Sequence, residues 1–286
     1  MSVFVVDKPR GMTSHDVVAR VRRALGTRQI GHAGTLDPMA TGVLVLAVGQ
    51  ATKLVAYLSA ADKEYEATIA LGVATDTLDA DGRVTERAPL PDDWRSRLDE
   101  ALAAERARSE QVPPAFSAIH AEGQRAHERA RRGEAVELGA RPVSVRELEV
   151  LETGDATLRL RLLVAKGYYV RSLARDLAAR LGTIGHLTEL RRLRSGAFTL
   201  AEATPLAALS PASASLPLET AAARVLPVAK LSEAGAAHAR AGRAVPPSEI
   251  EPAAPGVHAW LAPDGALVAV GEIEGDAGRV RRGFVS

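Results

Sequence analysis

The sequence predicts an α+β protein, in which a large domain is built on a mixed or antiparallel sheet with flanking helices and is followed by a small β-rich module. Residues 63–71 and 157–164 alternate apolar and polar side chains, as strands with one wet face do. Strand and helix patterns follow one another without the regular alternation of parallel α/β folds. A stretch rich in Ala, Ser and Pro, residues 201–224, then precedes a segment with hairpin character.

The elements can be placed in order along the chain. The predicted strands are 3–6, 43–48, 63–71, 143–151 and 157–164, and the predicted helices are 14–25, 94–106 and 170–181. Ser14 is the predicted N-cap of the first helix, and Gly26 ends it. We expect a large domain over 1–204, a linker with short helical turns over 205–224, and a module over 225–286 with a helix at 233–241 and a hairpin across 260–268.

Composition excludes several classes of protein. The 286 residues include no cysteine, which rules out disulfides, cysteine nucleophiles and the common structural zinc sites. Covalent chemistry must therefore use oxygen or nitrogen. No apolar stretch approaches the ~20 residues of a membrane span, and the first residues lead directly into a predicted strand without a signal-peptide pattern. We expect a cytoplasmic protein that does not bind membranes.

Charge is segregated along the chain although the net charge is only +1. Residues 62–105 hold 12 acidic and 5 basic side chains, whereas residues 158–198 hold 9 basic and 2 acidic ones. The second segment suggests a face that suits a polyanion such as a nucleic acid. The alternative is a set of solvated faces without a ligand.

One short segment has the composition of a loop that presents a carboxylate. Residues 31–44 read GHAGTLDPMATGVL, where glycines permit unusual backbone angles and Pro38 fixes the turn immediately after Asp37. Loops of this kind often carry function. The alternative is an ordinary turn that leads into the strand at 43–48.

The same segment resembles the nucleophile motif of the TruB family of tRNA pseudouridine synthases. Further segments resemble motifs of that family in the same order: DKPRGMTS at 7–14, KEY at 63–65, TDTLDADG at 75–82, KGYYVRS at 166–172 and LTELRRLRSG at 187–196. Residues 113–133 resemble the family's thumb, the segment that grips RNA. Tyr168 departs from the pattern, since the family usually has threonine there. The C-terminal residues resemble the family's PUA-like RNA-binding module in length and hairpin character.

The resemblance assigns roles to individual residues. It makes Asp37 the catalytic aspartate, Arg171 its ion-pair partner, and Tyr65 the ring that stacks on the target uracil and acts as general base. The implied substrate-binding residues are His32, Tyr65, Tyr169 and Leu190, the implied supports of the nucleophile loop are Lys8, Pro9 and Lys166, and the RNA backbone is expected to contact Arg129, Arg131 and Arg132 within a thumb at about 113–141. Taken alone, Tyr65 is equally typical of a core residue with its hydroxyl at the edge.

Two segments resemble metal-binding motifs but lack the ligands that those motifs require. A calcium loop at 75–82 would need Asp at position 77 and Glu at position 88, which are Thr and Ala. A zinc deaminase reading of His120–Glu122 needs a cysteine pair that the chain lacks. We therefore expect no metal and no cofactor.

The resemblance implies isomerisation of uridine to pseudouridine at position 55 in the tRNA T loop, by a monomer that needs no protein partner. Two alternatives stay open. One is a tRNA-binding or RNA-folding module without catalysis, which the presence of Asp37, Tyr65 and Arg171 disfavours because binding needs no nucleophile. The other is the catalytic subunit of a guide-RNA particle, which shares the core motifs.

Overall fold

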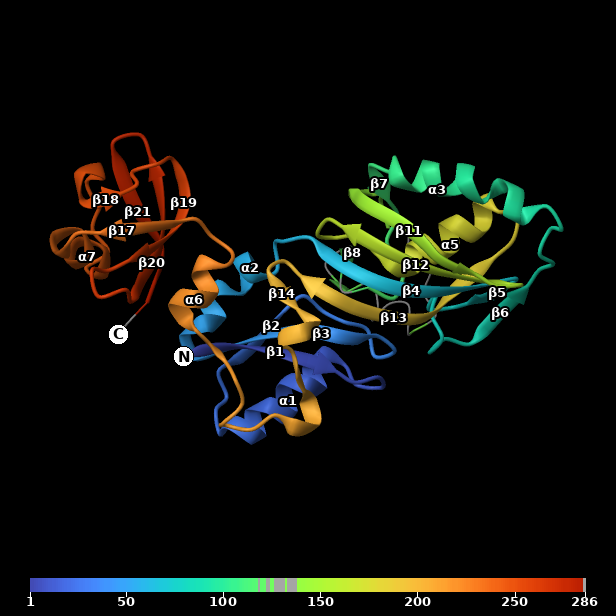
Figure 1. The fold of residues 1–286 in the computed structure, drawn as a ribbon, viewed down its shortest axis with the longest axis horizontal. Coiled ribbons are helices and arrows are strands. Elements are labelled where there is room, and N and C mark those ends of the chain that lie inside the picture. The colour runs from blue at the N-terminus through green and yellow to red at the C-terminus, as the bar shows by residue number, and fades with distance from the viewer. Residues whose placement is uncertain (118, 122–123, 126–131, 133–137, 285–286) are drawn as a thin grey trace.

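The structure is a computed structural model that describes residues 1–117, 119–121, 124–125, 132 and 138–284. Figure 1 shows two β-structured parts, a long twisted sheet with helices packed against it and a smaller C-terminal module at one end. Both chain ends lie near this module, where Met1 and Phe284 line the same small cavity. None of the described helices combines the length and apolar composition needed to cross a bilayer.

The large sheet is mixed, as the sequence predicted. Its main path in spatial order is β11 (Val145–Thr153), β12 (Thr157–Val164), β4 (Lys63–Leu71), β13 (Gly185–Ser195), β3 (Thr41–Val48), β1 (Ser2–Lys8) and β15 (Thr204–Pro205). The short strands β2 (Ile30–Ala33), β14 (Phe198–Thr199) and β16 (Leu216–Pro217) pair with β3, β13 and β1. Only the β13–β3 and β1–β15 pairs of this sheet are parallel among the described residues. The alternation of apolar and polar residues predicted the bounds of β4 and β12 correctly, because each strand buries one face.

Strand β13 is central to the sheet, although no strand is predicted for these residues from the sequence. It pairs antiparallel with β4 over its whole length and parallel with β3 at Arg191 and Arg192, so it joins the two halves of the domain. Two irregularities interrupt its register, and they break the simple alternation of buried and exposed residues. Three arginines near its end further hide the strand pattern.

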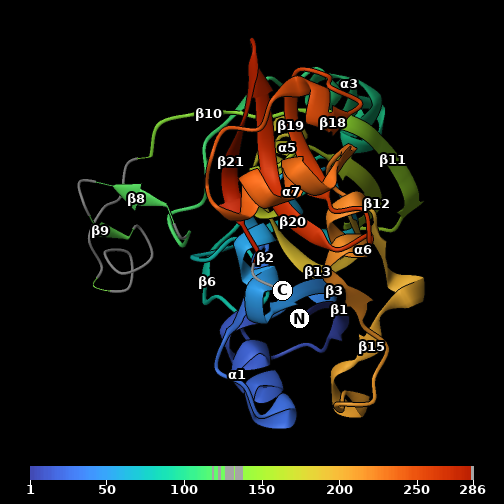
Figure 2. The same ribbon diagram turned by 90° about the vertical axis from the view of Figure 1, so that its left-hand side faces the viewer.

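Helices cover both faces of the sheet (Figure 2). On one face, α1 (Ser14–Leu25), α3 (Leu98–Arg106) and α5 (Val170–Arg180) bury their apolar sides in a common core. On the other face, η1 (Gly49–Leu54), α2 (Val55–Leu58) and α6 (Leu218–Ala223) form a second core with β1 and β3. The predicted helix at 94–106 starts as a 3₁₀ turn, η2 (Trp94–Arg97), before α3.

The prediction of Ser14 as the N-cap of α1 was wrong, because Thr13 caps the helix. The Thr13 hydroxyl accepts from the Asp16 amide at 3.0 Å, and the Asp16 carboxylate accepts from the Thr13 amide at 2.9 Å. This reciprocal capping box requires an acidic residue three positions after the cap, a condition that Thr13 meets and Ser14 does not. The Ser14 hydroxyl is free to bind the backbone of Leu36 instead.

Residues 205–224, expected as a linker, pack on the large sheet. Within and beside them, β15 and β16 pair with β1, and η3 (Leu200–Glu202) and η4 (Leu206–Ala208) form short turns. Helix α6 buries Leu218, Ala221 and Ala222. Small apolar residues thus let this helix approach the sheet closely.

The C-terminal module is a five-stranded sheet with one helix. Its strands in spatial order are β18 (Ile250–Glu251), β17 (Val228–Leu231), β19 (Gly256–Leu261), β20 (Leu267–Glu274) and β21 (Ala277–Gly283), accompanied by α7 (Glu233–Arg240) and η5 (Pro247–Glu249). The predicted hairpin is β19–β20, which turns at Gly265. Val270 and Phe284 join Leu218 of α6 in the second core, and the Lys53 ammonium donates to the Gly283 carbonyl at 2.7 Å. These contacts hold the module against the large sheet.

Three two-stranded pairs complete the described strands. They are β5 (Val73–Thr75) with β6 (Val84–Arg87), β7 (Glu110–Gln111) with β10 (Arg141–Pro142), and β8 (His120–Ala121) with β9 (Gln124–Arg125). Residues 118, 122–123, 126–131 and 133–137 of the expected thumb at 113–141, among them Arg129 and Arg131, lie outside the described residues.

The basic segment at 158–198 does not form a single basic face. Six of its nine cations lie within 4 Å of a carboxylate: Arg159, Arg161, Arg171, Arg175, Arg191 and Arg194. A seventh, Arg192, is buried. Strands send successive side chains to opposite faces, and the neighbouring strand β4 supplies the acidic partners of Arg159, Arg161 and Arg194. Segregation along the sequence is therefore not segregation in space.

We expect Gly42→Ala to lower the free energy of unfolding by about 3 kcal/mol or more. Gly42 has φ +99°, and a Cβ there would lie 2.2 Å from the Arg192 carbonyl oxygen. Gly26→Ala is the matched control, since Gly26 has φ +63° but no atom within 4 Å of an added Cβ. It should cost only about 1–2 kcal/mol. Denaturant titration of both variants measures the difference, and equal losses would contradict the close approach of β3 to β13.

Candidate active site

The loop between β2 and β3 presents Asp37 to one face of the sheet. Leu36, Met39 and Ala40 are buried and hold the loop down, while the Asp37 carbonyl accepts from the Ala40 amide at 3.1 Å to form a tight turn. Gly34 enters the loop with φ +90°. The apolar residues on both sides leave the carboxylate of Asp37 pointing outward.

Residues from the N-terminal motif bind the backbone of this loop. The Lys8 ammonium is fully buried and donates to the carbonyls of Met12 at 2.6 Å, Pro9 at 2.9 Å and Pro38 at 3.3 Å. Ser14 both donates to the Leu36 carbonyl and accepts from the Leu36 amide. Lys8 thus lies where a support of the nucleophile loop is expected, whereas Pro9 is exposed and contributes only its carbonyl.

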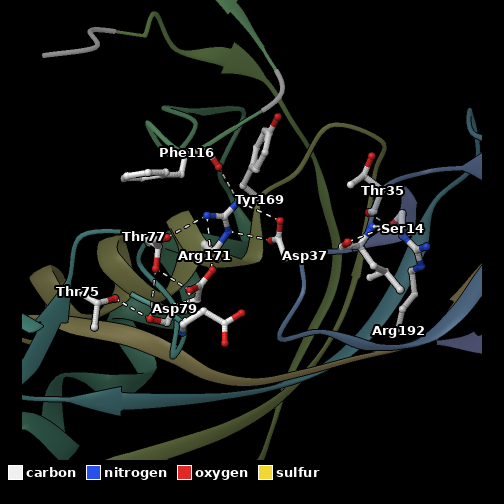
Figure 3. Close-up of polar contacts among 12 residues, drawn as sticks. Ser14, Thr35, Asp37, Thr75, Thr77, Asp79, Phe116, Tyr169, Arg171 and Arg192 are labelled. Carbon is white, nitrogen blue, oxygen red and sulfur yellow. Dashed lines mark hydrogen bonds and ion pairs between the residues drawn. The ribbon is translucent and has the colours of Figure 1, made fainter. Parts of the chain in front are cut away.

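Arg192 is a second support, which was not predicted from the sequence. Its guanidinium is almost fully buried and donates to the carbonyls of Val43 at 2.7 Å, Gly34 at 3.0 Å and Thr35 at 3.3 Å. Figure 3 shows Arg192 beside Thr35. It is two residues beyond Leu190 on the same strand. Residues two apart on a strand lie on the same face, so a predicted strand at β13 would have placed Arg192 on the face of Leu190 and the site.

Arg171 pairs with Asp37 through two contacts (Figure 3). Its Nε lies 2.9 Å from one carboxylate oxygen, and its Nη2 donates to the other at 3.2 Å. The same guanidinium donates to the carbonyls of Thr77 and Phe116, each at 2.9 Å. The side chain of Arg171 is only 7% exposed, but that of Asp37 retains 33% of its exposure. The pair therefore holds the carboxylate in a fixed orientation and leaves part of it accessible.

Burial raises the pKa of the Asp37 carboxyl above its ordinary value, Arg171 opposes that rise, and the nearby Asp79 adds to it. Removal from water is the largest cause because it penalises the charged form. A poorly hydrated carboxylate that remains accessible is a better nucleophile than a fully solvated one.

Asp79 is a further member of the site that sequence reasoning left without a role. Its Oδ2 lies 3.6 Å from Arg171 Nη1, and its Oδ1 accepts from the Thr77 hydroxyl at 2.6 Å and the Asp81 amide at 3.1 Å. Leu78 takes φ +62° in this turn. The loop that resembled a calcium site thus presents Asp79 to an arginine, and the described residues contain no cluster of His, Cys, Asp and Glu suited to a metal.

A cavity of about 670 Å³ opens above Asp37. Tyr65 of β4, Leu190 of β13 and Tyr169 at the start of α5 line it, together with Phe116 and Arg171. The volume is within the range of small-molecule sites, and its walls combine aromatic rings with a few convergent polar groups. Burial raises the pKa of Tyr169, so its hydroxyl is neutral at neutral pH.

The other described residues implied by the resemblance do not line the cavity. His32, on β2, does not line the cavity; its ring meets the ring of His15 edge-on at 5.3 Å, and His15 does line it. Burial, followed by His15 and Arg192, lowers the pKa of His32. Lys166 is exposed on the turn before α5, and Arg132 is an exposed turn residue.

Tyr168, which stands where the family usually has threonine, also lines the cavity. Its hydroxyl donates to Glu105 at 2.7 Å, and Glu105 is fully buried and paired with Arg108 at 2.6 Å. Burial raises the pKa of Tyr168 well above its ordinary value. The substitution is thus accommodated by a buried network between α3 and α5.

Comparison with known families decides the assignment. Residues 22–170 match the N-terminal domain of the TruB family pseudouridylate synthases, and residues 171–230 match the C-terminal domain of tRNA pseudouridylate synthase B. The chain belongs to the TruB family. Among curated relatives, the tRNA pseudouridine synthase B of Mycobacterium sp. (strain KMS) is 48% identical over 94% of this chain and 91% of its own length. That of Thermobifida fusca (strain YX) is 47% identical over 94% of each chain.

Solved structures agree with this TruB assignment. A Cbf5–Nop10–Gar1 complex includes a chain that superposes with a TM-score of 0.75 at 28% identity, covering 99% of this chain and 85% of that one. An H/ACA RNP bound to a substrate RNA containing 2′-deoxyuridine gives 0.72 at 26%, covering 100% and 85%. The family resemblance and the α+β fold class are both confirmed.

We expect Lys8 to make stability depend on pH. Burial lowers its pKa from 10.5 to about 8, so on acidification the unfolded chain takes up the proton first and the folded state loses stability between about pH 10.5 and 8. Relative to Lys8→Met, the wild type should lose up to about 3 kcal/mol across this interval. Urea titrations from pH 7.5 to 10 test this, with Lys230→Met, an exposed position, as control. A difference that does not change with pH would contradict it.

Proposed function

We propose that this TruB family protein isomerises uridine to pseudouridine in tRNA, at uridine 55 of the T loop. The observation that carries the proposal is the Asp37 carboxylate, fixed by Arg171 and partly exposed in a cavity walled by Tyr65, Tyr169 and Leu190. Curated relatives of nearly the same length carry the name tRNA pseudouridine synthase B.

The reaction detaches uracil from its ribose, rotates it and joins it again through C5, so no atom is gained or lost and no cofactor is needed. Asp37 acts at the ribose anomeric carbon, as nucleophile or as electrostatic partner of the developing positive charge, in the way carboxylates act at sugar centres. Arg171 keeps Asp37 ionised and oriented.

The cavity must also hold a base that has left its stack. Extrusion costs a few kcal/mol, and stacking on an aromatic ring returns about 1–3 kcal/mol per base. Tyr65 provides that ring and serves as general base in the final proton removal. Tyr169 and Leu190 line the base site, and His32, through its contact with His15, helps to hold the flipped RNA.

The partner is the T arm of tRNA. Arg129, Arg131 and Arg132 of the thumb contact its phosphate backbone, and the C-terminal module adds RNA contacts. The protein acts in the cytoplasm as a monomer without a protein partner. Lys166 has a supporting role beside the site.

Two other functions are less well supported. A binding or folding module would not need the Asp37–Arg171 pair. A guide-RNA-dependent subunit is suggested by the structural neighbours, which belong to an H/ACA RNP and a Cbf5–Nop10–Gar1 complex. Those chains are 26–28% identical to this one, whereas the tRNA pseudouridine synthases B are 44–48% identical.

The direct test is to incubate purified protein with unmodified tRNA alone and map pseudouridine along it. We expect modification at position 55 without guide RNA and in the presence of a metal chelator. Modification that appears only after a guide RNA is added would favour the particle subunit.

Asp37→Asn should abolish isomerisation and leave tRNA affinity within about tenfold, because phosphate contacts dominate binding. Single-turnover formation of pseudouridine and a filter-binding titration measure the two effects. Asp81→Asn is the control, since it neutralises another carboxylate at the cavity wall without touching Arg171. Turnover near the wild-type rate in Asp37→Asn would exclude Asp37 as the reacting group.

Two substitutions of Tyr65 distinguish three roles for its side chain. If its hydroxyl takes the final proton, Tyr65→Phe should slow the reaction about 10²–10⁴-fold with little change in affinity. If the ring only stacks, Phe should be active and Leu impaired. Single-turnover rates with tRNA binding separate these cases, and a fully active Leu variant would remove Tyr65 from the site.

A further inference from the structure

Two segments far apart in the chain are joined beside the Asp37–Arg171 pair. One is residues 111–117, which precede the thumb, and the other is residues 169–175, which begin α5. Five side-chain hydrogen bonds to backbone connect them: Tyr169 amide to Gln111 at 2.8 Å, Gln111 to the Tyr169 carbonyl at 3.1 Å, Ser172 to the Val112 carbonyl at 2.9 Å, Arg175 to the Val112 carbonyl at 3.1 Å and Arg171 to the Phe116 carbonyl at 2.9 Å.

Gln111 is almost completely buried, with 2% of its surface exposed. A backbone amide only donates and a carbonyl only accepts, so the two bonds to Tyr169 fix which end of the Gln111 amide is oxygen. Gln111 also pairs in register with Arg141. The chain that leaves at β7 and returns at β10 contains the thumb, and Gln111 therefore lies at the base of that excursion.

Tyr169 is the N-cap residue of α5, and its own side chain makes no capping hydrogen bond. Gln111 binds both the amide and the carbonyl of this residue, which fixes the peptide from which the helix starts. Arg171 follows two residues later in the first turn. Its Nη2 then donates to both Asp37 and the Phe116 carbonyl. Gln111 and Phe116 thus hold the start of the helix and the guanidinium that it carries.

We propose that Gln111 is a positioning residue for the reaction, which holds the start of α5 so that Arg171 stays against Asp37 and ties this alignment to the base of the thumb. The expected effect of Gln111 on the reaction rate rests on the proposed function. Its expected effect on the titration of the Asp37 carboxylate does not.

Two substitutions test the role. Gln111→Met keeps the length of the side chain and removes both hydrogen bonds without adding charge. Gln111→Glu keeps the acceptor for the Tyr169 amide but replaces the donor with an oxygen that faces the Tyr169 carbonyl. Glu110→Gln, at the exposed neighbouring position of β7, is the matched control. Circular dichroism identifies folded variants, and the role is judged on Gln111→Glu alone if Gln111→Met does not fold.

The first set of measurements is the single-turnover rate of pseudouridine formation, the same rate as a function of pH from 5 to 8, and the affinity for tRNA. We expect both Gln111 variants to react about 10- to 100-fold more slowly, as displaced catalytic groups do, with affinity within about threefold. Because Arg171 lowers the pKa of Asp37, its displacement should also move the acid limb of the profile to higher pH. Glu110→Gln should match the wild type.

The second measurement is a ¹³C NMR titration of the Asp37 carboxyl in the free protein, assigned with Asp37→Asn. Gln111→Met should move this titration to higher pH even if the protein made no pseudouridine. An inactive wild-type protein would contradict the proposed function. An unchanged Asp37 titration in Gln111→Met would contradict the inference. A wild-type rate in the folded variants would overturn the inference. Slower reaction explained by weaker tRNA binding, with an unchanged acid limb, would also overturn it.

Discussion

The ion pair between Asp37 and Arg171 is the constraint on which the rest of the structure depends. It joins residues 134 positions apart, and it removes an arginine almost completely from water. Such a buried cation is tolerated only when its donors all find acceptors. Here two carboxylates and two backbone carbonyls provide them: Asp37, Asp79, Thr77 and Phe116. Three loops therefore have to meet at the N-terminus of α5.

Below the pair, two more buried cations hold the loop of Asp37 by its carbonyl groups. Lys8 reaches it from the end of β1 and Arg192 from β13, so the loop is bound from the two strands that flank β3. Backbone carbonyls are good partners here because they satisfy a cation without competing for the charge of Asp37. Lys8 also lowers the pKa of Asp37, which favours the ionised form.

Electrostatics in this protein is local. The basic segment at 158–198 supplies the partner of Asp37, a support of its loop and several pairs on the outer face of the sheet, such as Arg159 and Arg161 with Glu66. Its linear charge suggested one surface for a polyanion. Alternation along β12 places Arg159 and Arg161 on one face, and only the tertiary pairing shows which charges of the segment meet a carboxylate.

The sequence by itself determined the fold class, the strands β4 and β12, the helices α1 and α5, and Asp37 as the residue on a presented loop, because these depend on periodicity and on turn-forming residues that act locally. The resemblance added Arg171 as its partner. Tertiary structure alone decided that residues 185–195 form the central strand, and that Arg192, Asp79 and Gln111 belong to the site. Each of these depends on a partner distant in sequence, such as Gly34, Arg171 or Tyr169, and no local pattern records which residue folding will bring there.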